Sequence, residues 1–175
     1  MLGLYIHIPF CKRKCFYCDF VSIEYLEELA DNYLKALQIE SLKYKNEKID
    51  TIYIGGGTPS VLSVVQLEKL ISVIKLNFDI SNIQEYTIEL NPESTTKEKL
   101  EFLYNSNISR ISFGLQSIFN DNLNILGRLH NYEKFKSVHE TKFNCTRNTE
   151  KNNVGNRTSE NAVRKNERLA GVIYG

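Results

Sequence analysis

The sequence predicts an α/β fold built on a parallel β-sheet. Short β-rich runs alternate with longer runs of helical periodicity through the first 136 residues. A polar or glycine-rich loop follows each strand-like run. Repeats of strand, loop and helix at this spacing are typical of parallel sheets with right-handed crossovers, so we expect the strands to share one direction.

Each strand of this sheet is marked by its own apolar run, and each is followed by a helical stripe. The expected strands cover residues 4–8, 49–54, 86–90 and 110–115. The expected helices include residues 26–37, 67–74, 100–103 and 123–126. Ser63 with Gln66, and Thr95 with Glu98, predict capping boxes at the starts of the second and third helices.

The residues with the most distinctive chemistry all follow a strand. Three cysteines come after the first strand, the glycines 55–57 after the second, residues 91–93 after the third and Gln116 after the fourth. In parallel β/α sheets the carboxyl ends of the strands share one edge, where binding sites form. We therefore expect four loops to converge on a single site.

Composition and charge exclude several classes of protein. The chain of 175 residues is 42% hydrophobic and 25% charged, and its net charge is +1. A charge near zero argues against a nucleic-acid or membrane surface that depends on bulk electrostatics. No apolar run approaches the about 18 residues of a membrane span, and the start of the chain lacks the basic residues of a signal peptide. We expect a cytoplasmic protein with no membrane span and no nucleic-acid partner.

The cysteine pattern indicates a metal centre. Cys11, Cys15 and Cys18 fall within eight residues, whereas a disulfide framework would spread its cysteines along the chain. Thiolates select zinc, copper(I) or iron–sulfur clusters. Zinc structural sites normally have four ligands, but three cysteines on a four-iron cluster leave one iron open. The cations at 12–14 would offset the charge of thiolates and sulfides. The pattern favours a cluster, with a zinc-stabilised structural domain as the alternative, and Cys145 is expected to be a free thiol.

Other polar and glycine positions on the same edge suit a bound ligand. The glycines 55–57 remove every Cβ, so that a ligand can approach the backbone and its N–H groups, although a tight turn would need them too. Glu89 lies near the end of the third strand, where a carboxylate requires a partner such as an amine or hydroxyls. Gln116 suits a polar cofactor. Arg128 either binds a carboxylate or is solvated. His7 shares a strand face with Tyr5.

Taken together, these residues resemble the radical S-adenosylmethionine (SAM) superfamily. The resemblance is closest to the branch that contains oxygen-independent coproporphyrinogen III oxidase and the HemW heme chaperones. The matching segments, in the family's order, are residues 4–20, 55–60, 89–93, 110–117 and 126–130. The resemblance implies a partial TIM-type barrel, of which about four of six β/α units are present here.

The resemblance also implies the cofactors. A [4Fe-4S] cluster would be held by Cys11, Cys15 and Cys18, and its open iron would be chelated by SAM. By motif match, the expected contacts to SAM are Tyr5, Gly56, Gly57, Thr58, Glu89, Gln116 and Arg128.

One position separates the two members of the branch. Phe20 stands where the oxidase has a further cysteine. This difference favours a HemW-like protein, which binds and transfers heme. The implied partners are therefore heme or a porphyrin, an electron-donor protein and a heme acceptor. The alternative is a coproporphyrinogen oxidase or another radical SAM enzyme.

The resemblance stops near Lys136, where the composition changes. Residues 137–175 contain seven Asn, four Arg and three Lys, whereas the preceding residues contain twelve Lys and three Arg. We expect a truncated core over 1–136 and a polar tail over 137–175 that is either disordered or foreign to the domain, for example translated out of frame. On this interpretation the edge of the fourth strand is unpaired, and activity is lost or impaired.

Overall fold

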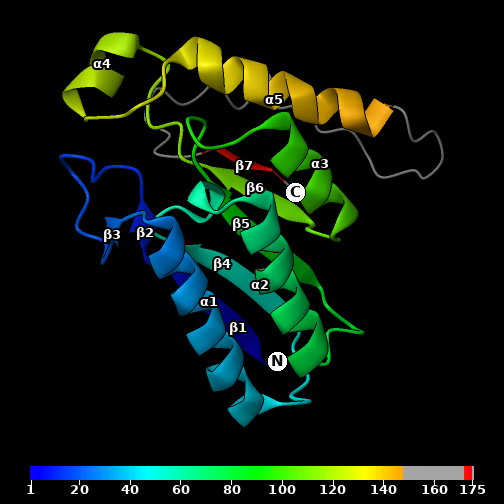
Figure 1. The fold of residues 1–175 in the computed structure, drawn as a ribbon. Helices are drawn as coiled ribbons and strands as arrows, with labels where there is room; N and C mark the ends of the chain where they lie inside the picture. The colour runs from blue at the N-terminus through cyan, green and yellow to red at the C-terminus, as the bar shows by residue number, and fades with distance from the viewer. Residues whose placement is uncertain (148–171, 175) are drawn as a thin grey trace.

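The computed structural model describes residues 1–147 and 172–174, with side chains up to residue 141. Within this part of the chain, five strands form one sheet in the order β1-β4-β5-β6-β7 (Figure 1). The strands are β1 (Gly3–Ile8), β4 (Thr51–Gly56), β5 (Glu85–Leu90), β6 (Arg110–Phe113) and β7 (Val172–Tyr174). The first four pair in parallel, as predicted, and β7 pairs antiparallel to β6.

The helices lie on one face of this sheet. They are α1 (Glu27–Ser41), α2 (Val64–Asn77), α3 (Lys97–Asn105) and α5 (Tyr132–Arg147), with the 3-10 turns η1 (Leu42–Tyr44) and η2 (Pro59–Val61) between them. Figure 1 shows α1, α2 and α3 side by side in front of the strands, with α5 across the end of the layer. Crossovers that always return on the same face build a barrel wall rather than a doubly wound sheet. The short helix α4 (Asn120–Ile125) lies beyond the carboxyl end of β6.

Alternation along the strands separates a core face from an open face. Ile6, Ile8, Ile52, Ile54 and Ile88 are at most 5% exposed beneath the helices. The residues between them, including Tyr5, Tyr53 and Glu89, lie on the opposite face. On α1 the buried positions are Ala30 and Leu34, whereas Leu26 and Leu29 are exposed at its start.

One of the two predicted capping boxes is correct. The Ser63 side chain accepts a hydrogen bond from the Gln66 amide, and the Gln66 side chain accepts one from the Ser63 amide. The prediction for α3 was wrong by one residue, because Thr96 rather than Thr95 caps the Lys99 amide. Thr95 is 1% exposed and its hydroxyl donates instead to the Asn91 carbonyl at 2.8 Å. Thr95 therefore stabilises the loop after β5, and α3 begins after Thr96, which is its N-cap.

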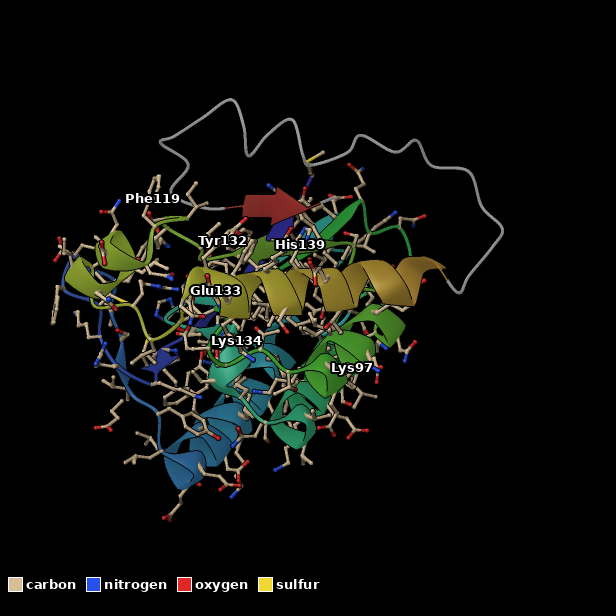
Figure 2. All side chains as sticks on the ribbon, turned by 90° about the horizontal axis from the view of Figure 1, so that it is seen from above. Lys97, Phe119, Tyr132, Glu133, Lys134 and His139 are labelled. Carbon is tan, nitrogen blue, oxygen red and sulfur yellow. The ribbon has the colours of Figure 1, made fainter. Side chains whose placement is uncertain are left out.

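Helix α5 continues without a break across the predicted boundary after Lys136, from Tyr132 past His139 (Figure 2). Phe135 and Val138 are buried, and the Phe135 ring packs edge-on against Phe113 with centroids 5.9 Å apart. The edge of β6 was predicted to be unpaired, but residues 172–174 pair with residues 111–113 there. The rest of the predicted tail lies outside the described residues. Over the described chain, no helix combines the length and apolar character needed to cross a membrane.

Candidate functional site

The three cysteines lie on one closed loop at the carboxyl end of β1. The loop begins in β2 (Phe10–Cys11) and ends in β3 (Ile23–Glu24), and these two short strands pair in parallel. Backbone bonds from the Ile23 amide to the Pro9 carbonyl, 2.7 Å, and from the Tyr25 amide to the Cys11 carbonyl, 2.9 Å, close its base. All three thiols are half-buried and free.

Two hydrogen bonds anchor this loop to the segment between α4 and α5. The Arg13 guanidinium donates to the Gly127 carbonyl at 2.8 Å, and the Phe16 amide donates to the Leu126 carbonyl at 3.2 Å. Gly127 has a φ of 72°, and a Cβ there would lie 3.1 Å from the Phe16 ring. The glycine thus allows both the left-handed turn and the close approach of the ring.

The loops after β4, β5 and β6 meet the cysteine loop through polar side chains. Thr58 Oγ1 lies 3.4 Å from Cys11 Sγ and accepts a hydrogen bond from Asn91 Nδ2 at 2.9 Å. Arg128, only 8% exposed, donates to Asn91 Oδ1 and to the Gly114 carbonyl at 2.6 Å each. Its other terminal nitrogen lies 3.5 Å from Cys15 Sγ and from the Tyr17 hydroxyl. The predicted convergence of four loops is confirmed.

A buried acidic group accompanies Arg128. The Glu93 carboxylate lies 3.2 Å from His130 Nδ1 and 4.0 Å from Arg128 Nη2. Burial alone would raise the pKa of Glu93, but the hydrogen bond with His130 and the charge of Arg128 outweigh it and lower the pKa. The other ring nitrogen of His130 contacts the Leu115 carbonyl at 3.2 Å. The segment around Arg128 is therefore fixed to the loops after β5 and β6.

The glycine loop differs from the prediction in one respect. Its amides were expected to face a ligand, but Gly56 donates to Glu89 at 3.2 Å, Gly57 to the Ile8 carbonyl at 2.8 Å and Thr58 to the Phe10 carbonyl at 2.8 Å. The bonds of Gly57 and Thr58 extend the pairing between β1 and β4, and the Gly56 amide is taken by a side chain of β5, so the three N–H groups are already used. The missing side chain still matters at Gly56, where φ is 109°.

Glu89 lies on the open face of the sheet beside a group of rings. Its carboxylate accepts from the Tyr53 hydroxyl at 2.5 Å, as well as from the Gly56 amide. Burial, and then the adjacent Glu89 carboxylate, raise the pKa of Tyr53. Tyr5 stacks on Tyr53 with centroids 6.1 Å apart, and its hydroxyl lies 2.9 Å from His7 Nδ1. His7 Nε2 in turn lies 2.9 Å from the Val21 carbonyl at the end of the cysteine loop.

The predicted site residues therefore form two neighbouring groups. Thr58, Gln116 and Arg128 lie at the carboxyl edge, where a Cβ on Gly114 would meet the side chains of Asn91, Arg128 and Gln116. Tyr5 and Glu89 lie on the open face of the sheet. The hydrogen bond from the Gly56 amide to the Glu89 carboxylate joins this group to the carboxyl edge. Sequence reasoning missed the roles of four residues that the geometry brings into the site: Asn91, Tyr17, Glu93 and His130. All four stand inside the matched motifs, but only their contacts show what they do.

A pocket of about 260 Å³ opens beside the first cysteine. It is lined by residues 11–14 and 22–24 and so combines the Cys11 thiol with three cationic side chains. None of the residues predicted to contact SAM lines this pocket.

The chemistry of the donors fits an iron–sulfur cluster, although among the described residues no three Cys, His, Asp or Glu side chains are gathered closely enough to hold a metal ion. Three free thiols on one short loop supply the soft ligands that such clusters take. The guanidinium of Arg128 faces one thiol, and its Nε is buried with no hydrogen-bond partner in the described structure. A buried donor without a partner is costly and leaves a place for an acceptor on a ligand.

Fold and site together define a β/α-barrel protein with a three-thiol centre at the carboxyl ends of its strands. The chain belongs to the radical SAM superfamily, whose family model matches residues 5–148. Membership of this superfamily implies a [4Fe-4S] cluster and SAM.

Curated relatives place the chain in the HemW branch of the superfamily. It is 43% identical over 126 residues to the heme chaperone HemW of Lactococcus lactis and 40% identical over 135 residues to that of Bacillus subtilis. These matches cover 72% and 74% of this chain but 33% and 36% of the relatives. The chain thus spans about a third of the length of the relatives it matches.

A solved structure confirms the predicted fold. The structure of coproporphyrinogen III oxidase (HemN) from Escherichia coli, described as a radical SAM enzyme, superposes with a TM-score of 0.74 at 26% identity. The superposition covers 82% of this chain and 34% of the oxidase.

Proposed function

We propose that the chain forms the cluster- and SAM-binding part of a HemW-like heme chaperone. The observation that carries this proposal is the three-thiol loop joined to Thr58, Asn91 and Arg128 in a chain that is 43% identical to a heme chaperone. Cys11, Cys15 and Cys18 would each supply one thiolate to a [4Fe-4S] cluster.

The remaining predicted residues would hold SAM against the open iron. Arg128, with its unpartnered Nε, would bind the carboxylate of SAM, and Gln116 beside it would add a neutral polar contact. Glu89 would accept from an amine or from hydroxyls, in competition with Tyr53 and Gly56. On the side of β1 and β4, the SAM site would be lined by Tyr5, Gly56, Gly57 and Thr58. When bound, the cluster and SAM supply one-electron cleavage of the sulfonium, while this chain positions both groups and limits access by water.

Heme is the proposed cargo. Phe20, 66% exposed on the cysteine loop, stands where the oxidase of the same branch has a further cysteine. A phenyl ring cannot replace a thiol as a ligand or as a redox group. This difference favours heme binding and transfer over oxidation of coproporphyrinogen, with an electron donor and a heme acceptor as the implied protein partners.

The test is anaerobic reconstitution with iron and sulfide, followed by metal analysis and a heme titration. We expect about four irons per chain, saturable heme binding, and no conversion of coproporphyrinogen III. One zinc per chain and no iron would identify a zinc-stabilised domain. Conversion of coproporphyrinogen III without heme binding would identify an oxidase.

A further inference from the structure

We propose that Asn91 is a positioning residue that couples two cluster-ligating thiols through one side-chain amide and thereby raises the reduction potential of the cluster. This inference rests on the proposed function, because it requires that Cys11 and Cys15 ligate iron. Asn91 follows β5 directly and touches neither sulfur itself. It acts through Thr58 on one side and through Arg128 on the other.

The donor end of the amide controls Thr58. Asn91 Nδ2 donates to Thr58 Oγ1 at 2.9 Å, and the same oxygen lies 3.4 Å from Cys11 Sγ. A ligating thiolate has no proton to give, so the Thr58 hydroxyl must be the donor in that contact. By donating to the oxygen of Thr58, Asn91 leaves the hydroxyl hydrogen directed at the sulfur.

The acceptor end of the amide controls Arg128. Asn91 Oδ1 and the Gly114 carbonyl each accept from Nη2 at 2.6 Å. Since a guanidinium only donates, the oxygen of the amide must face Arg128, and its nitrogen must face Thr58. With Nη2 fixed in this way, Nη1 lies 3.5 Å from Cys15 Sγ. A carboxylate at position 91 could accept a hydrogen bond from Arg128 but could not donate one to Thr58.

The backbone of Asn91 is itself held in place. Its amide donates to Ser60 Oγ at 2.9 Å, and its carbonyl accepts from the Thr95 hydroxyl at 2.8 Å. Lys99 donates to the carbonyls of Ser60 and Ser94 at 2.7 and 2.9 Å, which ties the same two loops together. The amide is therefore presented to Thr58 and Arg128 from a rigid support.

Hydrogen bonds to the sulfurs of a cluster, and charges close to it, tune the reduction potential of the metal centre. Reduction adds negative charge to the cluster and its thiolates, so donors aimed at the sulfurs stabilise the reduced form. Loss of the whole amide leaves the Thr58 hydroxyl free to turn and deprives Arg128 of one of its two acceptors, whereas a carboxylate at position 91 releases Thr58 alone. The cluster should then become harder to reduce.

The test compares Asn91→Asp and Asn91→Leu with the control Thr87→Val in the full chain. Thr87→Val removes a buried hydroxyl of β5, which donates to Glu85 at 2.8 Å, but leaves the contacts of Asn91 with Thr58 and Arg128 in place. We would measure iron content, melting temperature and the cluster midpoint potential by redox titration followed by electron paramagnetic resonance.

Both Asn91 variants should hold iron like the control and show a more negative potential than the wild type, while Thr87→Val leaves the potential unchanged. Equal potentials in all four proteins would overturn the inference alone. So would loss of iron from both Asn91 variants with retention in Thr87→Val, because that effect would be purely structural. A wild type without a cluster would overturn the proposed function as well.

Discussion

The Nη1 atom of Arg128 lies 3.5 Å from the Sγ atom of Cys15, although the two residues are 113 positions apart in the chain. The guanidinium is brought there by the turn at Gly127 and is held by Asn91 and Gly114. Arg128 is thus a buried cation beside the cysteine loop, and its Nε has no hydrogen-bond partner in the described structure. This is the arrangement expected of a residue that donates both to a thiol and to an anionic ligand.

Arg128→Lys should weaken SAM binding while the cluster is retained. Lysine keeps the charge but loses the planar fork that reaches Asn91, Gly114 and the ligand together, so we expect a loss of about tenfold or more in affinity. The matched control is Arg110→Lys, because Arg110 pairs with Glu85 on the open face of the sheet. Calorimetric titration of SAM into the reconstituted proteins measures both. Equal affinities for the two variants would remove Arg128 from the binding site.

Alanine substitution of any one of the three loop cysteines, Cys11, Cys15 or Cys18, should abolish the reconstituted cluster, because on the proposed assignment each would supply the ligand of a different iron. Cys145→Ala should leave the iron content unchanged. Iron and sulfide analysis after anaerobic desalting provides the measurement. Equal loss of iron in the Cys145 variant would contradict the ligand assignment.

Glu89→Gln should reduce SAM affinity by about tenfold while the iron content stays constant, because the amide is a weaker acceptor for the ligand's amine or hydroxyls.

Gly57→Val should behave differently. A Cβ at Gly57 would lie 2.8 Å from the Phe10 carbonyl and 2.9 Å from the Ile8 carbonyl, both backbone atoms at the start of the cysteine loop. We therefore expect Gly57→Val to lose iron as well as SAM. Iron retention in Gly57→Val with lost SAM binding would show that the loop adapts.

The sequence predicted the sheet, its strand order along the chain and the edge that holds the site, because each depends on local periodicity and on the geometry of parallel strands. Gly56 and Gly57 were recognised for the same reason. Their amides were assigned to a ligand because the chain alone does not show that Ile8, Phe10 and Glu89 come close enough to accept from them. The role of Asn91 depends on two partners at once, which only the folded geometry reveals. The boundary at Lys136 was predicted from composition, which does not reveal that Val138 is buried.

Lys99 should make stability depend on pH between about 8 and 10. Burial, with a smaller contribution from the charge of Lys12, lowers the pKa of Lys99 to about 8 from its ordinary value of 10.5. The unfolded chain therefore binds this proton more tightly than the folded protein, so the free energy of unfolding rises with pH in this window. Because Lys99 is only half-buried, solvent screening keeps its contribution to stability well below the full free energy of the shift.

The comparison for Lys99 is with Lys99→Met, which removes this titration and also the hydrogen bonds to the Ser60 and Ser94 carbonyls. The change of the difference with pH, rather than its size at one pH, is therefore the measured quantity. The difference in unfolding free energy between the wild type and the variant should move in favour of the wild type from pH 8 to pH 10. Urea denaturation at several pH values provides the measurement. A difference that stays constant over this range would show that the ammonium group is as well solvated as in the unfolded chain.

Helix α5 should contribute to the core beyond the compositional boundary at Lys136. Val138 is 5% exposed on this helix, whereas Lys136 two residues earlier is exposed. Val138→Ala should lower the free energy of unfolding by about 2 kcal/mol, through lost burial and a small cavity. Lys136→Ala should change it by less than about 0.5 kcal/mol. Both values come from urea denaturation of the reduced apo-protein. If Val138→Ala is as neutral as Lys136→Ala, the folded unit ends near residue 136, and the helix beyond it packs without stabilising the domain.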